Sequence, residues 1–315
     1  EAPGVTPARN EHITDPKNGE LDMLFLFDHV GVDQAVSKWD VVPFEVRNLR
    51  ARMADQQAAV KNAGWASLFF CNHDQPRVVS RWGNDSDRES RELSAKAFGM
   101  LLHMHRGTPY IYEGEELGMT NAHFTELGQY RDLEAINAYR QRVEEAKCQS
   151  SESMMAALAL IGRDNARTPM QWDASKYAGF TAADAATEPW ISVNPNRVEI
   201  NAAEEFDDPE SVYSFYKKLI AMRHNNATIA TGEWNLLDAD DDQVYAFTRT
   251  SGDDTILVIV NVSDKSSDVP TQVADLLAGG INESQVLLST YDAMRSVKSI
   301  ARGELARWEG VVIQL

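Results

Sequence analysis

The stretch LFFCNHDQPRVVSRWG, residues 68–83, decides the fold of this chain. It begins with the apolar run 68–71, which predicts a strand that is buried on both faces. The run stops at Asn72, and the residues that follow are His73 and Asp74. A histidine and a carboxylate that end an apolar strand raise the question of what they do there, which the neighbouring segments answer.

Two other segments have the same pattern of an apolar run that ends in polar residues, LDMLFLFDHV (21–30) and YIYEGEELG (110–118). Between the three runs, apolar residues recur at helical spacing over 44–64 and 93–104. Strands that alternate with amphipathic helices indicate a parallel sheet that is covered on both faces. In a barrel of parallel strands the chemistry lies at the carboxyl-terminal strand ends. We therefore expect the polar residues at these strand ends to lie close together.

The rest of the chain divides into a helical part with long loops and a final β-rich part. The segment 131–161 is helical and polar, and the irregular stretches after it are of the length that usually carries function. The segment 207–225 predicts a helix with Asp208 as its N-cap. From about residue 229 the apolar period becomes that of strands, which predicts a small antiparallel β domain.

The composition favours a globular protein with a neutral substrate. The chain has 315 residues, of which 43% are hydrophobic and 25% charged, so it is long enough for one large α/β domain and a smaller one. Its formal net charge of -18 disfavours nucleic acid and anionic membrane as partners. The two cysteines imply no disulfide framework, so we expect a reducing, cytoplasmic location. The spacing of metal ligands is absent, and no metal or cofactor is expected in this segment.

Five stretches, taken in this order, make the chain similar to the α-amylase family of retaining glycoside hydrolases, and within it to the oligo-1,6-glucosidase and α-glucosidase branch. They span nearly the whole chain and are EAPGVT (1–6), LFFCNHDQPRVVSRWGND (68–85), GTPYIYEGEELGM (107–119), GRDNARTPMQWD (162–173) and PWISVNPN (189–196). The resemblance implies an α/β fold, in which the carboxyl-terminal half of a (β/α)8 TIM barrel over 1–228 precedes a small antiparallel β-sandwich domain over 229–315.

The resemblance also implies which residues carry the chemistry. Retaining hydrolysis needs a carboxylic acid that protonates the leaving oxygen and a carboxylate, about 5 to 5.5 Å away, that attacks the sugar. Glu1 matches the acid/base glutamate, and Asp74 matches a third carboxylate that holds sugar hydroxyls and favours the transition state. No stretch matches the segment with the nucleophilic aspartate. We therefore expect an amino-terminal half of the same polypeptide, with any calcium loop, to precede Glu1, and the present chain to be inactive alone.

Four further residues match positions that bind the substrate. His73 would bind the same sugar hydroxyls as the neighbouring aspartate, and Arg163 would reach the outermost hydroxyl of the terminal glucose. Arg167 and Glu134 would border the next sugar site.

Each of these groups also has a structural interpretation. The histidine and aspartate could be a simple pair, and the arginines could fix loops by ion pairs with Asp164 and Asp173. At the third strand end, Glu113, Glu115 and Glu116 are expected to form a solvated rim rather than catalytic groups.

Three functions remain open on the sequence alone. The first is an α-glucosidase that releases glucose from the non-reducing end of short oligosaccharides, and EAPGVT leans towards α-1,6 linkages. The second is a related trehalose synthase or sucrose isomerase, or a trehalose-6-phosphate hydrolase. The third is a catalytically silent fragment or binding relative, like the amino-acid-transporter heavy chains. The presence of Glu1, His73 and Asp74 favours an enzyme.

Overall fold

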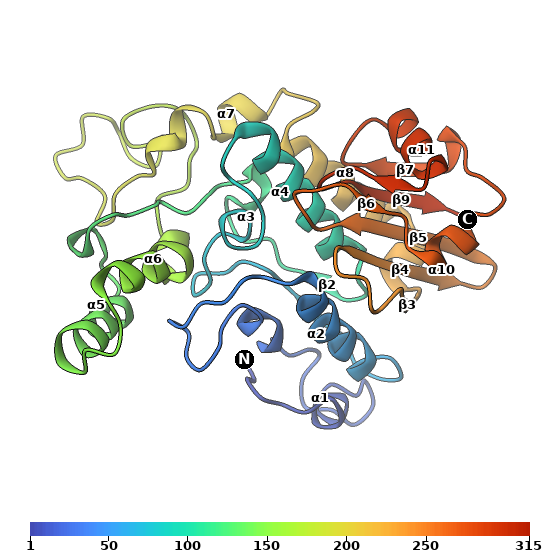
Figure 1. The fold of residues 1–315 in the computed structure, drawn as a ribbon, viewed down its shortest axis with the longest axis horizontal. Coiled ribbons are helices and arrows are strands. Elements are labelled where there is room, and N and C mark those ends of the chain that lie inside the picture. The colour runs from blue at the N-terminus through green and yellow to red at the C-terminus, as the bar shows by residue number, and fades with distance from the viewer.

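In the computed structural model, which describes residues 1–315, the three predicted strand segments lie side by side (Figure 1). Strand β1 (Ser67–Leu68) pairs in parallel with β2 (Thr108–Pro109), and Leu24 forms a parallel bridge with Ala66. The segments therefore follow one another across the sheet in chain order, as parallel barrel strands do.

The regular strands are much shorter than the apolar runs that predicted them. Their backbone groups instead bind side chains at the strand ends. The carbonyl of Phe69 accepts a hydrogen bond from His29 Nε2 at 2.7 Å, and the carbonyl of Glu113 accepts one from Arg77 at 2.5 Å. These contacts take up carbonyl groups that a longer strand would have used in its ladder.

Three helices cover the parallel segments and form the main core with them. They are α2 (Val46–Ala59), α4 (Arg88–Met104) and α8 (Val212–Asn225). The shorter helices are α1 (Pro7–Ile13), α3 (Val78–Arg81), α5 (Leu133–Tyr139), α6 (Ser151–Ile161), α7 (Ala202–Glu205) and α9 (Ala227–Thr231). None of the helices combines the length and the apolar character that crossing a membrane requires.

The start of α8 differs from the prediction. Ser211, rather than Asp208, is the N-cap, because its side chain accepts the hydrogen bond from the Ser214 N–H. Asp208 lies one turn earlier, where its side chain accepts from the Glu210 N–H and its carbonyl accepts from Ser211 Oγ. The predicted cap therefore belongs to a separate turn that leads into the helix.

The carboxyl-terminal part is built on one antiparallel sheet, as the change of period predicted. Its strand order is β3 (Glu233–Leu237), β4 (Val244–Ser251), β5 (Asp254–Asn261), β9 (Gly310–Gln314) and β7 (Val286–Ser289). Strands β4 and β5 form a hairpin whose turn contains Gly252 at φ +61°, a backbone conformation that favours glycine. A two-stranded sheet of β6 (Ser267–Asp268) and β8 (Glu304–Leu305) lies beside it, with helices α10 (Thr271–Leu276) and α11 (Ala293–Ala301).

Both faces of this sheet are buried, which fixes its position against the parallel segments. On one face, Tyr245, Phe247 and Val258 join the main core with α4 and α8, and Figure 1 shows the sheet next to these helices. On the other face, Val273 of α10 and Ile300 of α11 complete a second core. The fold is thus the second half of a (β/α)8 barrel followed by an antiparallel β domain.

Candidate active site

Asp74 lies in a tight turn directly after the buried strand end. Its backbone N–H donates to Asn72 Oδ1 at 2.7 Å, which fixes the start of the turn. The His73 ring is largely exposed, and its Nε2 atom lies 3.3 Å from Asp74 Oδ2. The Asp74 carboxylate is about one third exposed, so it can reach a bound molecule from a fixed position.

Two arginines at the two ends of one helical turn hold the Asp74 carboxylate: Arg163 begins the 3₁₀ helix Arg163–Ala166, and Arg167 is its C-cap. Arg167 Nη2 donates to Asp74 Oδ1 at 2.7 Å and Arg167 Nε donates to the His73 carbonyl at 2.8 Å. Arg163 Nη1 donates to the same Oδ1 atom at 3.3 Å. The structure therefore brings together four of the predicted site residues, which come from segments about 90 positions apart in the chain.

Asp132, which the sequence did not single out, is the main partner of Arg163. It accepts two parallel hydrogen bonds, from Arg163 Nε at 2.8 Å and from Nη2 at 2.7 Å, in the fork geometry that makes such pairs strong. Burial opposes ionisation of Asp132, but the hydrogen bonds from Arg163 and from the Glu134 N–H, together with the charges of Arg163 and Arg167, outweigh it, so the pKa of Asp132 lies below its usual range. Hydrogen bonding to Asp132 also raises the pKa of Arg163.

Glu134 completes the charge network at its outer edge. Its Oε2 atom lies 3.1 Å from Arg163 Nε and 2.8 Å from Lys38 Nζ. Asp74, Asp132 and Glu134 thus balance three cations, Lys38, Arg163 and Arg167. A network of alternating charges at the ends of different loops is suited to binding a neutral, hydroxyl-rich ligand, because it offers both donors and acceptors.

Buried polar groups fix the loop that carries the two arginines. Asp164, which is fully buried, accepts the backbone N–H groups of Arg131 at 2.6 Å and Asp132 at 2.9 Å. Arg77 is also buried and donates to the carbonyl of Ala166 at 3.3 Å. The proposed pairs of the arginines with Asp164 and Asp173 are therefore absent: Asp164 binds backbone, and Asp173 accepts the Ser175 N–H at 2.8 Å.

Glu1 is not part of this cluster. Its side chain is exposed and takes part in no hydrogen bond or ion pair in the structure, while the neighbouring Ala2 N–H donates to the Phe25 carbonyl at 3.1 Å. The structure therefore shows no contact of Glu1 that bears on the acid/base role, which rests on the resemblance.

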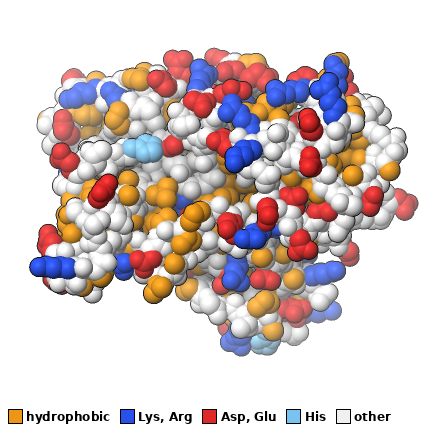
Figure 2. All heavy atoms as spheres, viewed as in Figure 1, with side chains coloured by type: hydrophobic (Ala, Val, Ile, Leu, Met, Phe, Trp, Pro, Cys, Tyr) orange, Lys and Arg blue, Asp and Glu red, His pale blue; other side chains and the backbone are white.

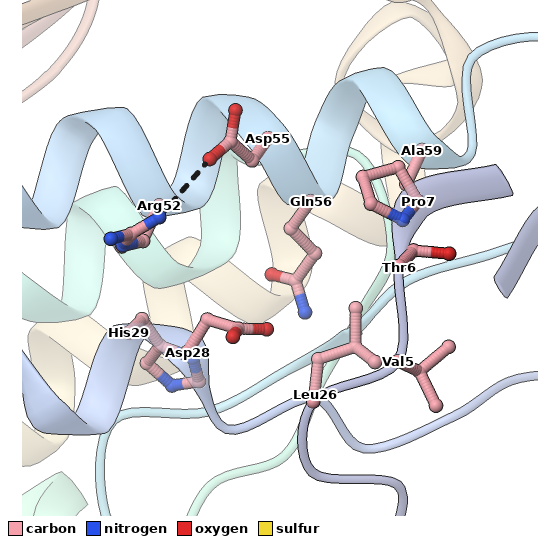
Figure 3. Close-up of a pocket in the computed structure, with 11 residues that line it drawn as sticks. Val5, Thr6, Pro7, Leu26, Asp28, His29, Arg52, Asp55, Gln56 and Ala59 are labelled. Carbon is pink, nitrogen blue, oxygen red and sulfur yellow. Dashed lines mark ion pairs between the residues drawn. The ribbon is translucent and has the colours of Figure 1, made fainter. Parts of the chain in front are cut away.

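The strand-end groups of the first segment are also separate from Asp74. Burial lowers the pKa of His29 to about 4, so its ring is neutral and donates from Nε2 to Phe69. Asp28 and His29 line a cavity of about 230 Å³ between α2 and the segment 4–7 (Figure 3). Not all predicted strand-end groups converge, because this segment turns into a 3₁₀ helix at Asp28.

The prediction of a solvated glutamate rim is wrong for one residue. Glu115 is only 3% exposed, whereas Glu116 accepts the Gly114 N–H at 2.8 Å from a partly buried position. The charge pattern at the surface is otherwise mixed: Figure 2 shows acidic side chains over much of the visible face, with basic side chains between them. No group of three or more His, Cys, Asp or Glu side chains is arranged to hold a metal ion.

Comparisons with known proteins cover almost the whole chain. The family model of the alpha amylase catalytic domain matches residues 1–232, and that of the maltogenic amylase C-terminal domain matches residues 234–281. The oligo-1,6-glucosidase of Parageobacillus thermoglucosidasius is 42% identical over 318 residues, which cover 100% of this chain and 54% of that protein. The glucan 1,6-alpha-glucosidase of Streptococcus pneumoniae serotype 4 is 41% identical over 301 residues, covering 92% of this chain and 54% of that protein.

Solved structures show the same fold. The trehalose-6-phosphate hydrolase of Bacillus licheniformis superposes with a TM-score of 0.86 at 37% identity, over 98% of this chain and 54% of that one. A variant of the trehalulose synthase MutB gives a TM-score of 0.86 at 36% identity, over 99% of this chain and 54% of that one. The chain spans about half the length of the relatives that it matches. On its sequence and its fold, the chain belongs to the α-amylase family of glycoside hydrolases.

Proposed function

We propose that the protein is a retaining α-glucosidase that releases glucose from the non-reducing end of short α-glucosides, with α-1,6-linked isomalto-oligosaccharides as its substrates. The observation that carries this proposal is the Asp74 carboxylate, which is held by Arg163 and Arg167 at the end of a barrel strand. The similarity to oligo-1,6-glucosidases supports the substrate class.

In this proposal, Asp74 binds hydroxyl groups of the glucose unit whose bond is cleaved. A carboxylate accepts hydrogen bonds from adjacent hydroxyls, and its charge favours the positively charged sugar of the transition state. His73, beside it, donates to the same sugar. Arg163 retains partial exposure and presents its guanidinium to the far side of the glucose, and Arg167 and Glu134 border the next sugar.

Glu1 is proposed as the general acid that protonates the leaving oxygen, on the strength of the EAPGVT resemblance. Retention also needs an attacking carboxylate, and no residue of this chain is proposed for that step.

The substrate is tested by product analysis of the protein expressed from its natural gene. With isomaltose, maltose, sucrose and trehalose 6-phosphate supplied in turn, we expect glucose to be released fastest from isomaltose, with the α-anomer formed first. The structural similarity to trehalulose synthase and to trehalose-6-phosphate hydrolase favours two alternatives. Isomerisation of sucrose, or faster cleavage of trehalose 6-phosphate, would identify one of them and contradict the α-1,6 preference.

Arg163→Ala should lower kcat/KM on an aryl α-glucoside, by an amount that corresponds to about 2 to 4 kcal/mol of lost transition-state binding. The loss has two sources, since the variant removes a donor to the sugar and takes from Asp132, 4% exposed at its side chain, its main partner. Arg167→Ala should cost less, because Asp132 would keep its two hydrogen bonds from Arg163.

Arg163→Lys is the matched control for that experiment. It keeps the positive charge but cannot form the two parallel bonds to Asp132, so an intermediate loss is expected. If both alanine variants showed small and equal losses, the arginines would only fix the loop and would not contact the substrate.

A further inference from the structure

The cavity of about 230 Å³ between helix α2 and the segment 4–7 is separate from the proposed active site (Figure 3). None of the residues that line it is among the predicted site residues, so the proposed glucosidase function gives it no role. Its volume is that of about seven water molecules, at ~30 Å³ each. The cavity is therefore large enough for a small organic ligand.

The cavity has an apolar end and a polar end. Figure 3 shows Val5, Pro7 and Ala59 at one end, whereas Arg52 and His29 lie at the other. Small-molecule sites commonly combine apolar walls with a few polar groups that fix the orientation of the ligand. A ligand that suits this cavity has an apolar body and one polar head group.

Gln56 gives the polar end a buried acceptor that is not used. Its side chain points from α2 towards the space beside Asp28, as Figure 3 shows, and the residue is 6% exposed. Its Nε2 atom donates to the Ser67 carbonyl at 3.3 Å, but its Oε1 atom has no hydrogen-bond partner. A buried acceptor without a partner is costly, so a ligand that donates to it recovers this cost.

His29 and Asp28 add two further acceptors. His29 is 3% exposed, and its Nε2 atom donates to the Phe69 carbonyl at 2.7 Å. The neutral ring therefore has a lone pair on Nδ1, which takes part in no hydrogen bond. The Asp28 carboxylate is exposed and takes part in no hydrogen bond or ion pair. The polar end thus offers three unused acceptors, one of which is charged.

The charges around the cavity favour a cation. Arg52 is the one cationic side chain in the lining, and its Nη1 atom lies 3.6 Å from Asp55 Oδ2. The charge of Asp28 is therefore left without a counter-charge from the lining. The net charge of -18 on the whole chain adds to the attraction of a cation. A sugar fits less well, because its hydroxyl oxygens also need donors, which this lining provides mainly through the paired arginine.

We propose that this cavity is a binding site for a small primary amine in its ammonium form. An ammonium group has three N–H donors and no acceptor, which matches the unused acceptors of Asp28, Gln56 and His29. The apolar body of the amine packs against Val5 and Leu26. Binding is non-covalent and does not depend on the proposed glucosidase function, because no lining residue has a role in that function.

Titration calorimetry at neutral pH tests the site, with cyclohexylammonium as the probe and the protein expressed from its natural gene. Cyclohexanol is the matched control ligand, because it has the same ring but a neutral head group with a single donor. We expect cyclohexylammonium to bind with a dissociation constant of about 1 mM, which is reasonable for a ligand of this size. Cyclohexanol should bind at least about tenfold more weakly, because it lacks the charge.

Asp28→Asn should weaken the binding of cyclohexylammonium by about tenfold or more. It keeps the size of the side chain and breaks no contact, so the fold should be retained. Asp22→Asn is the matched control, since Asp22 is an exposed carboxylate of the same segment that does not line the cavity. Gln56→Met should weaken binding about fivefold, and its unfolding midpoint shows whether the lost bond to Ser67 affects the fold.

Asp74→Asn separates this cavity from the proposed active site, whose carboxylate also attracts cations. If the amine binds as before to Asp28→Asn but is lost from Asp74→Asn, it occupies the active site and the inference is wrong. Equal binding of cyclohexanol, or no saturable binding of the amine, would also overturn it and leave a cavity that holds water. If the protein cleaves no α-glucoside but binds the amine in the way that depends on Asp28, the proposed function fails and the amine site stands.

Discussion

Asp74→Asn should lower kcat on isomaltose and on an aryl α-glucoside by about a thousandfold or more. The substitution keeps the size of the side chain but removes its charge. It also replaces one oxygen with an NH2 group, while the oxygen that remains can still accept from Arg163 and Arg167 as Oδ1 does. Because the proposed role of the charge is to favour the oxocarbenium-like transition state, KM should change much less than kcat.

Steady-state kinetics of Asp74→Asn and of Glu113→Gln, in the protein expressed from its natural gene, test this expectation. Glu113 lies at the next strand end, and its side chain makes no hydrogen bond or ion pair, although its carbonyl binds Arg77. Its variant should therefore retain nearly full turnover. Thermal unfolding of both variants separates a loss of chemistry from a loss of fold. If Asp74→Asn kept more than about a tenth of wild-type kcat, Asp74 would not have the proposed role.

The part of the site that the sequence predicted consists of residues in short, distinctive motifs. His73 and Asp74 come just after a buried apolar run, and Arg163 and Arg167 lie in one motif, GRDNAR; these motifs carry the resemblance to the α-amylase family, and that resemblance singled the residues out. The structure then brought these two motifs into contact. Their roles towards a substrate stay predictions, as do those of Glu1 and Glu134.

The partners that hold these residues were not predictable, because their contacts are long-range and their local sequence is ordinary. Asp132 is also the N-cap of α5, since it accepts the Glu134 N–H at 3.1 Å. Its fork with Arg163 depends on how the loop folds back over 31 positions. Glu115 was misread for a similar reason: a glutamate in GEELG is typical of a surface, and only the packing of α8 against the strand end buries it.

The fold was predicted better in its order than in its boundaries. The spacing of apolar residues predicted the alternation of strands and helices and the change to an antiparallel sheet. Burial determines the spacing in each of these elements. It could not give the strand lengths, because side chains such as Arg77 and His29 compete with the ladder for the same carbonyls.

Asp33→Ala should produce the largest loss of stability among single substitutions around the site. Arg81 forms two bonds to Asp33, from Nε at 2.7 Å and from Nη2 at 2.6 Å, and both side chains are 2% exposed. Trp82 Nε1 donates to the same carboxylate at 3.0 Å. Removing the aspartate leaves a buried guanidinium without a counter-charge, which costs about 3 to 5 kcal/mol of unfolding free energy.

A double variant separates the stability of this pair from its effect on the site. Asp33→Leu with Arg81→Met removes both charges, so denaturant unfolding should show a much smaller loss than for Asp33→Ala alone. Arg81 Nη1 also donates to Gln75 Oε1 at 2.8 Å, next to Asp74, and the double variant loses this contact. We therefore expect the double variant to be stable yet reduced in kcat. If the double variant were as unstable as Asp33→Ala, the packing around the pair, rather than the unpaired charge, would set the cost. If it were stable with wild-type kcat, Gln75 would not need Arg81 to keep the Asp74 turn in place.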